Sequence, residues 1–113
     1  MNIHENDDGV YISSQISTDD LQAIADVGIR TVICNRPDRE DEGQPDFLLI
    51  QQAAAEYNIS LYYVPVTGSG VAENSLQAMI TILTQAERPL LAYCRSGNRS
   101  DTIYRLAKKI MAG

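Results

Sequence analysis

Residues 89–100 read Pro-Leu-Leu-Ala-Tyr-Cys-Arg-Ser-Gly-Asn-Arg-Ser, and this stretch decides the fold. Its first five residues, 89–93, have the length and composition of a buried strand. Beyond it, apolar residues recur at helical spacing: Ile103, Leu106, Ala107, Ile110 and Met111. The sequence therefore predicts a strand, a tight turn that begins at Cys94, and a helix.

The turn has the composition of an anion site. Successive backbone N–H groups in such a turn can form a concave nest, and the start of the following helix adds partial positive charge. That environment favours the thiolate of Cys94, while Arg95 and Arg99 supply fixed positive charge. We predict that Cys94 and Arg99 are catalytic. The residues predicted to bind the anion are Arg95, Ser96, Gly97, Asn98 and Ser100.

Several of these residues also have a plainer interpretation. A lone cysteine at a strand end is usually a small buried hydrophobe, but that does not explain two arginines and a glycine within five residues. Ser100 can hydrogen-bond the Cys94 sulfur or simply cap the last helix. Arg95 can line the pocket or face solvent. Cys34 is interpreted as a core thiol, with a redox-resolving role as the alternative.

The charge of the chain restricts its partners. Nine Lys and Arg residues stand against 15 Asp and Glu residues, for a net charge of −6, which argues against general nucleic-acid binding. Four of the seven arginines fall in two loops, which indicates a local anion site: Arg36, Arg39, Arg95 and Arg99. We see no membrane helix, secretory signal or disulfide framework, so we expect a cytoplasmic protein.

Strands alternate with helices along the chain. The predicted strands are residues 10–12, 31–34, 61–64 and 89–93. The predicted helices begin at Ser17 or Thr18, after an N-cap at Asp46, near Asn74 and after the Cys94 turn. This alternation predicts one α/β domain over residues 1–113, with a mainly parallel four-stranded sheet and helices on both faces.

In such a sheet, ligands bind outside the carboxyl ends of the strands. The loops after three strands should therefore open on one crevice, with Cys94 at its floor. The residues predicted to form its walls are Arg36, Asp38, Thr67 and Gly68. One histidine, His4, and two separated cysteines do not make a zinc site, so we expect neither a metal nor another cofactor.

The Cys94 loop resembles the active-site loop of rhodanese-type sulfurtransferases. It also resembles that of protein tyrosine and dual-specificity phosphatases, which have five residues between Cys and Arg, where this chain has four, and a His where it has Tyr93. Together with Val-Ile-Cys-Asn-Arg-Pro-Asp at 32–38 and Tyr-Val-Pro-Val-Thr-Gly at 63–68, it resembles the bacterial beta-lactamase-hydrolase-like, phosphatase-like domain. The resemblance covers roughly residues 8–112 and implies a dual-specificity-phosphatase-like fold. It also implies phosphatase activity or transfer of sulfane sulfur.

Phosphate ester hydrolysis would proceed through a cysteinyl phosphate on Cys94, with Arg99 clamping the phosphoryl oxygens. It normally needs an acid to protonate the leaving alkoxide, and Gly68 stands where dual-specificity phosphatases often carry an Asp. The opposing loop offers three candidate acids: Asp38, Asp41 and Asp46.

Sulfur transfer would pass a sulfur atom from a small anionic sulfane-sulfur donor through a Cys94 persulfide to a thiol acceptor. It needs no proton for the leaving group. Because the acid is missing and the loop is short, the sequence favours a sulfurtransferase. A phosphatase is the first alternative, and an anion-binding module without turnover is the second.

Overall fold

The computed structural model describes residues 1–113, except for the side chain of Asp7. Its centre is a five-stranded sheet in the order β1-β2-β5-β3-β4. The strands are β1 (Ile3–Glu5), β2 (Val10–Ser13), β3 (Thr31–Cys34), β4 (Ser60–Tyr63) and β5 (Leu90–Tyr93). The predicted α/β class and the mainly parallel sheet are confirmed, because only β1 runs antiparallel to its neighbour.

The predicted number of four strands is wrong, because β1 is an additional edge strand. All three of its residues are exposed, so it has no apolar face that a sequence pattern could reveal. It pairs with β2, with His4 opposite Ile12. This strand is therefore specified by backbone pairing with a neighbour rather than by its own composition.

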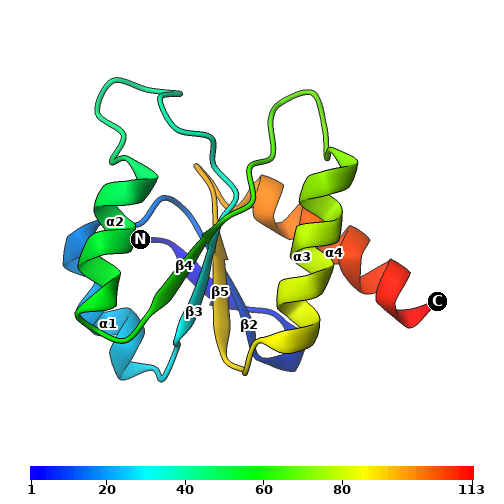
Figure 1. The fold of residues 1–113 in the computed structure, drawn as a ribbon, viewed down its shortest axis with the longest axis horizontal. Helices are drawn as coiled ribbons and strands as arrows, with labels where there is room; N and C mark the ends of the chain where they lie inside the picture. Colours follow the sequence, from blue (N-terminus) through cyan, green and yellow to red (C-terminus); the bar gives the residue numbers. More distant parts are fainter.

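Two pairs of helices cover the two faces of the sheet (Figure 1). The helices are α1 (Leu21–Asp26), α2 (Phe47–Ala55), α3 (Glu73–Gln85) and α4 (Asn98–Ala112), with short 3-10 turns η1 (Asp7–Gly9) and η2 (Thr18–Asp20). Val32 packs with the core under α1 and α2, whereas its neighbour Ile33 packs with the core under α3 and α4. This alternation explains why Val32, Ile33 and Cys34 of β3 are all buried, as expected of a strand covered on both faces.

The start of α2 differs from the prediction. Asp46 occupies the N-cap position, but its side chain makes no capping hydrogen bond. Asp38, earlier in the same loop, instead accepts a hydrogen bond of 2.9 Å from the backbone N–H of Phe47. An acid close in space but distant in sequence thus satisfies one free N–H group of the helix.

Helix α4 buries a narrower stripe than its apolar residues predicted. Ile103, Tyr104 and Ala107 are buried, while Leu106, Ile110 and Met111 are exposed. Its N-cap residue, Gly97, nevertheless lies close to β2, because a Cβ at this position would be 3.4 Å from the Ile12 side chain and 3.6 Å from the Ser13 carbonyl oxygen. No helix in the described part of the chain is both long enough and apolar enough to cross a membrane.

The carboxyl ends of three strands are joined by hydrogen bonds. The Asn35 N–H donates to the Tyr93 carbonyl at 2.8 Å, and the Asn35 side-chain amide donates to the Val64 carbonyl at 2.8 Å. The loops that follow β3, β4 and β5 consequently lie at the same end of the sheet (Figure 1). This end is where the topology predicts the crevice.

Candidate active site

Cys94 lies at the floor of this end of the sheet and is fully buried. Its Sγ accepts a hydrogen bond of 3.1 Å from the backbone N–H of Gly97. Gly97 has a φ of 102°, a conformation that lets the chain turn back sharply from the strand into α4. The loop therefore directs at least one of its amides toward the sulfur, as predicted for an anion nest.

Other amides of this loop remain available to a ligand. Among the hydrogen bonds of the described residues, none is donated by the backbone N–H of Ser96, Arg99 or Ser100. The Asn98 N–H is used within the loop, because it donates to Ser96 Oγ at 3.3 Å. An anion above Cys94 would meet unpaired donors at the positively charged end of α4.

The guanidinium of Arg99 is bound on one edge by Glu40. Arg99 Nη1 donates to Glu40 Oε2 at 2.7 Å, and Arg99 Nη2 donates to Glu40 Oε1 at 2.8 Å. Nη1 also donates to the carbonyl of Val66 at 2.9 Å. Arg99 is thus fixed by groups from the loops after both β3 and β4.

Arg36 is the buried centre of this ion-pair network. Its side chain is only 5% exposed and has three partners: Glu40 Oε1 at 3.0 Å, Gln15 Oε1 at 3.0 Å and Asp41 Oδ2 at 2.8 Å. Arg95 is mostly exposed, and its Nε lies 3.6 Å from the same oxygen of Asp41. Arg36 therefore holds the loop after β3 together, and Arg95 faces Asp41 from the exposed side. The wall position expected for Arg36 stays a prediction.

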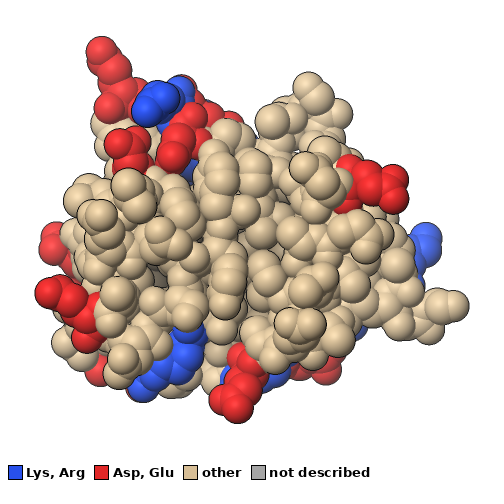
Figure 2. Space-filling model, in the orientation of Figure 1, with Lys and Arg blue, Asp and Glu red and all other residues tan. Residues whose placement is uncertain are grey.

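The electrostatics of the network follow from these contacts. The hydrogen bond from Arg99, together with Arg36, lowers the pKa of Glu40 to about 2. Glu40, followed by Cys94, raises the pKa of Arg99 above its usual value. Arg99 therefore lies within electrostatic reach of Cys94. Figure 2 shows charged side chains of both signs gathered over the loop between β3 and α2.

Three other residues predicted for the wall or the anion site make no hydrogen bond to Cys94: Thr67, Gly68 and Ser100. Thr67 and Gly68 are exposed in a turn, where Thr67 Oγ1 accepts a hydrogen bond from the Ser69 N–H. The hydroxyl of Ser100 is buried and has no hydrogen-bond partner among the described residues, so neither of its two predicted bonds is present. Its position in the first turn of α4 leaves it free to pair with a ligand.

Two of the three candidate acids already have other partners, whereas the carboxylate of Asp46 has no hydrogen bond or ion pair among the described residues. Asp38 serves α2 through its bond to Phe47, and Asp41 is held by Arg36 and Arg95. The carboxylate nearest Arg99 belongs instead to Glu40, which the sequence interpretation passed over. No local pattern marks Glu40, because its partner lies 59 residues away. Val66 and Gln15 were missed for the same reason.

Cys34 has the contacts of a core thiol. Its Sγ donates to the Arg36 carbonyl at 3.3 Å, and it packs with Tyr93 in the core under α1 and α2. Burial raises the pKa of the Cys34 thiol. This environment disfavours the thiolate that a resolving cysteine needs.

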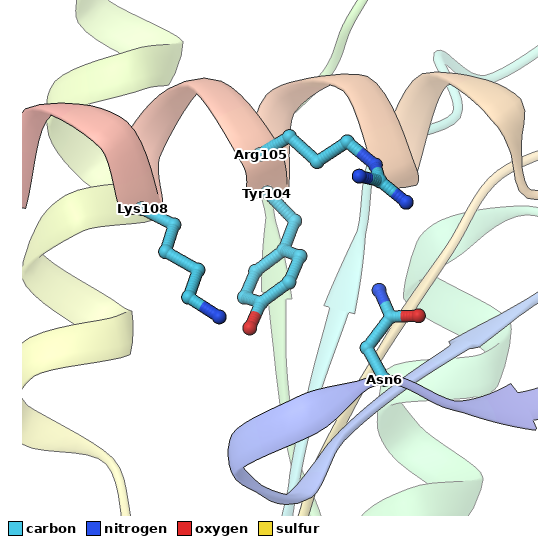
Figure 3. A pocket seen from close by; sticks show the side chains of 4 residues that line it. All are labelled: Asn6, Tyr104, Arg105 and Lys108. Carbon is cyan, nitrogen blue, oxygen red and sulfur yellow. The ribbon is translucent and has the colours of Figure 1, made fainter.

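A separate pocket lies beside α4 (Figure 3). Tyr104, Arg105 and Lys108 project into it from the helix, and Asn6 faces them from the segment after β1. Arg105 pairs with Asp101 at 2.8 Å, and Lys108 pairs with a neighbouring carboxylate at 3.3 Å. This pocket contains no residue of the Cys94 loop.

The chain is similar in sequence to proteins from several bacteria. Beta-lactamase hydrolase-like proteins from Xylella fastidiosa and Agrobacterium fabrum are 33% identical over 97% and 29% identical over 88% of this chain. The chain spans only 26% and 23% of the length of these two relatives.

The solved structures that the chain resembles are phosphatase-like. A candidate phosphatase from Neisseria meningitidis has a TM-score of 0.83 and 40% identity, covering 92% of this chain and 74% of its own. The catalytic core of the PP-IP phosphatase SIW14 from S. cerevisiae shares the fold, with a TM-score of 0.74 at 20% identity, over 100% of this chain and 68% of its own.

These likenesses confirm the predicted phosphatase-like fold. The sulfur transfer that the sequence favours receives no support from them. The family model for the beta-lactamase hydrolase-like protein, phosphatase-like domain matches residues 5–111, and the chain therefore belongs to that family.

Proposed function

We propose that this chain is a cysteine-dependent phosphatase that hydrolyses small phosphomonoesters through a cysteinyl-phosphate intermediate. The observation that carries the proposal is the hydrogen bond from the Gly97 N–H to the buried Sγ of Cys94, in a loop where the N–H groups of Ser96, Arg99 and Ser100 have no acceptor among the described residues. This sulfur is the nucleophile, because an anion bound by the loop amides would lie next to it.

The reaction has two steps. In the first, Cys94 Sγ attacks phosphorus, the sulfur–phosphorus bond forms and the bond to the leaving oxygen breaks. In the second, water attacks the same phosphorus, releases inorganic phosphate and returns the thiolate. The loop amides and the guanidinium of Arg99 stabilise the negative charge on the phosphoryl oxygens in both steps.

The protonation of the leaving group determines which esters react well. Glu40 is ionised at neutral pH, and Asp41 is paired with two arginines, so neither carboxyl group is suited to donate a proton in this arrangement. We expect aryl phosphates, whose leaving groups are weak bases, to react much faster than alkyl phosphates. Asp38 or Asp41 would be the acid if alkyl phosphates react equally well and a Asp38→Asn or Asp41→Asn substitution removes that activity.

Sulfur transfer is the second candidate function. The pairing of Asp38 and Asp41 with other groups favours it, because a leaving group such as sulfite from thiosulfate needs no proton. Cys94 would take the outer sulfur of thiosulfate as a persulfide and release sulfite, after which a thiol acceptor would remove the sulfur.

The experiment measures hydrolysis of p-nitrophenyl phosphate and, separately, the intact mass after incubation with thiosulfate. The proposal expects turnover of the aryl phosphate that disappears in Cys94→Ser. A stable gain of ~32 Da on Cys94, one sulfur atom, without phosphate release would instead establish sulfur transfer. If neither reaction occurs while phosphate still binds, the domain is an anion-binding module.

A further inference from the structure

Glu40 controls the direction in which Arg99 can bind an anion. We propose that Glu40 is a positioning residue, which holds the Arg99 guanidinium so that its remaining edge faces the anion bound at Cys94. This inference rests on the proposed function, because it takes Arg99 as the group that clamps the substrate.

The contacts of Arg99 use some of its hydrogen-bond donors and leave others free. A guanidinium has five N–H donors in one plane. Both hydrogens of Nη1 are used, one by Glu40 Oε2 and one by the Val66 carbonyl, and one hydrogen of Nη2 is used by Glu40 Oε1. The donors that remain are the Nε hydrogen and the second Nη2 hydrogen.

The two remaining donors lie on one edge of the plane and point in the same direction. Such an edge matches two oxygens of a phosphoryl group, which gives a bidentate contact. Glu40 therefore occupies the outer edge of Arg99 and leaves the second edge open. Because Glu40 binds one edge of Arg99 and leaves the other to the anion, it can position the guanidinium without occupying the substrate site.

Glu40 is in turn held in place by Arg36. Arg36 Nε donates at 3.0 Å to Glu40 Oε1, the same oxygen that accepts from Arg99 Nη2. The Arg36 side chain is only 5% exposed and has three partners, so its position is fixed. The position of Arg99 is thus connected through Glu40 to a buried group.

The alternative role for Glu40 is that of an internal competitor, whose carboxylate shields the site until a substrate displaces it. The two roles predict opposite effects of removing the carboxylate. A positioning residue makes anion binding weaker when it is lost, whereas a competitor makes anion binding tighter.

The test uses the whole chain with Glu40→Gln and Glu40→Ala. Glu42→Gln is the matched control, because Glu42 lies in the same loop, carries the same charge and has no hydrogen bond or ion pair among the described residues. The measurements are kcat and KM for p-nitrophenyl phosphate and the affinity for inorganic phosphate by calorimetry.

We expect Glu40→Ala to lower kcat/KM roughly ten- to a hundredfold and to weaken phosphate binding, because a displaced clamp loses its alignment with the reacting group. Glu40→Gln should lie between Glu40→Ala and the wild type, since its amide oxygen still accepts one hydrogen bond. Glu42→Gln should behave as the wild type. Tighter phosphate binding in Glu40→Ala, or unchanged binding in both Glu40 variants, would overturn the proposal.

Chemical rescue separates positioning from a loss of folding. Acetate can restore the missing carboxylate in Glu40→Ala, whereas acetamide has the same shape and no charge. We expect acetate to raise the activity of Glu40→Ala several-fold and acetamide to have no effect. Inhibition by acetate, or equal effects of the two compounds, would contradict the positioning role.

The calorimetric measurement also separates this inference from the proposed function. If the wild type binds phosphate but hydrolyses no phosphate ester, the proposed activity fails while the effect of Glu40 on phosphate affinity still tests the inference. If Glu40 variants hydrolyse and bind as the wild type does, the inference fails while the phosphatase proposal stands.

Discussion

The Cys94 loop and the loop between β3 and α2 form the same site in different ways. The Cys94 loop is organised by contacts within a few residues, such as the Gly97 N–H to Cys94 Sγ. The other loop contributes side chains that reach partners far along the chain, such as Glu40 to Arg99 over 59 residues. The turn around the nucleophile is thus shaped by local contacts, although the Cys94 N–H also donates to the Ser13 carbonyl at 3.3 Å, whereas the position of the clamp depends on long-range ion pairs.

We expect the largest effect on activity from a substitution of Cys94, and the second cysteine, Cys34, provides the comparison. Cys94→Ser should lower turnover of an aryl phosphate by roughly a thousandfold or more, because the hydroxyl is a far poorer nucleophile. The fold should persist, since the substitution changes one atom.

Cys34→Ala is the matched control for that prediction. Cys34 packs in the core, so its loss should reduce stability by about 1 kcal/mol and leave turnover intact. Steady-state kinetics and thermal unfolding measure both variants. Equal losses of activity in the two variants would show that the Cys94 loop has no special chemistry.

This comparison also shows how much the sequence could predict. The strand, the turn and α4 follow from patterns in residues 89–112, and the structure brings Cys94 and Gly97 together as predicted. Spacing and turn composition are local properties, which sequence reasoning interprets well.

The parts that could not be predicted depend on pairing in space. Strand β1 has three exposed residues and forms only because β2 offers a free edge. Asp38 caps α2 in place of Asp46, and Glu40 rather than an aspartate contacts Arg99. For the two carboxylate contacts, several acidic residues of the same loop compete for one partner, and only the path of the loop decides between them.

We expect a smaller loss of activity when the guanidinium of Arg99 is replaced by the ammonium group of a lysine. Arg99→Lys should lower kcat/KM roughly a hundredfold, because a lysine cannot bind Glu40 and two phosphoryl oxygens in one plane. Arg95→Lys is the control, since Arg95 lies at the exposed rim with one partner at 3.6 Å. Similar losses in the two variants would mean that the rim and the clamp contribute alike.

The loop between β3 and α2 should lose its order when its buried centre is removed. Arg36→Ala leaves Glu40 and Asp41 without their common partner and should lower the free energy of unfolding by about 1–3 kcal/mol. Arg39→Ala in the same loop, which has no ion pair among the described residues, should change it little. Urea unfolding measures both, and a neutral Arg36→Ala would contradict the role of the network.

The smallest effect concerns pH. Because the pKa of Glu40 is lowered from 4.5 to about 2, its contribution to stability is present above pH 4.5 and is lost as the pH falls toward 2. The difference in unfolding free energy between the wild type and Glu40→Gln should therefore shrink between pH 6 and pH 3. A difference that stays constant or grows would show that Glu40 is not ionised within the network.

The central claim is that the Cys94 sulfur attacks phosphorus, and rapid-quench mass spectrometry tests it directly. Mixed with an aryl phosphate and quenched in acid, the protein should carry an added mass of ~80 Da, one phosphoryl group, on the peptide that contains Cys94. Aryl phosphate hydrolysis with no such adduct, or hydrolysis that continues in Cys94→Ser, would contradict the account.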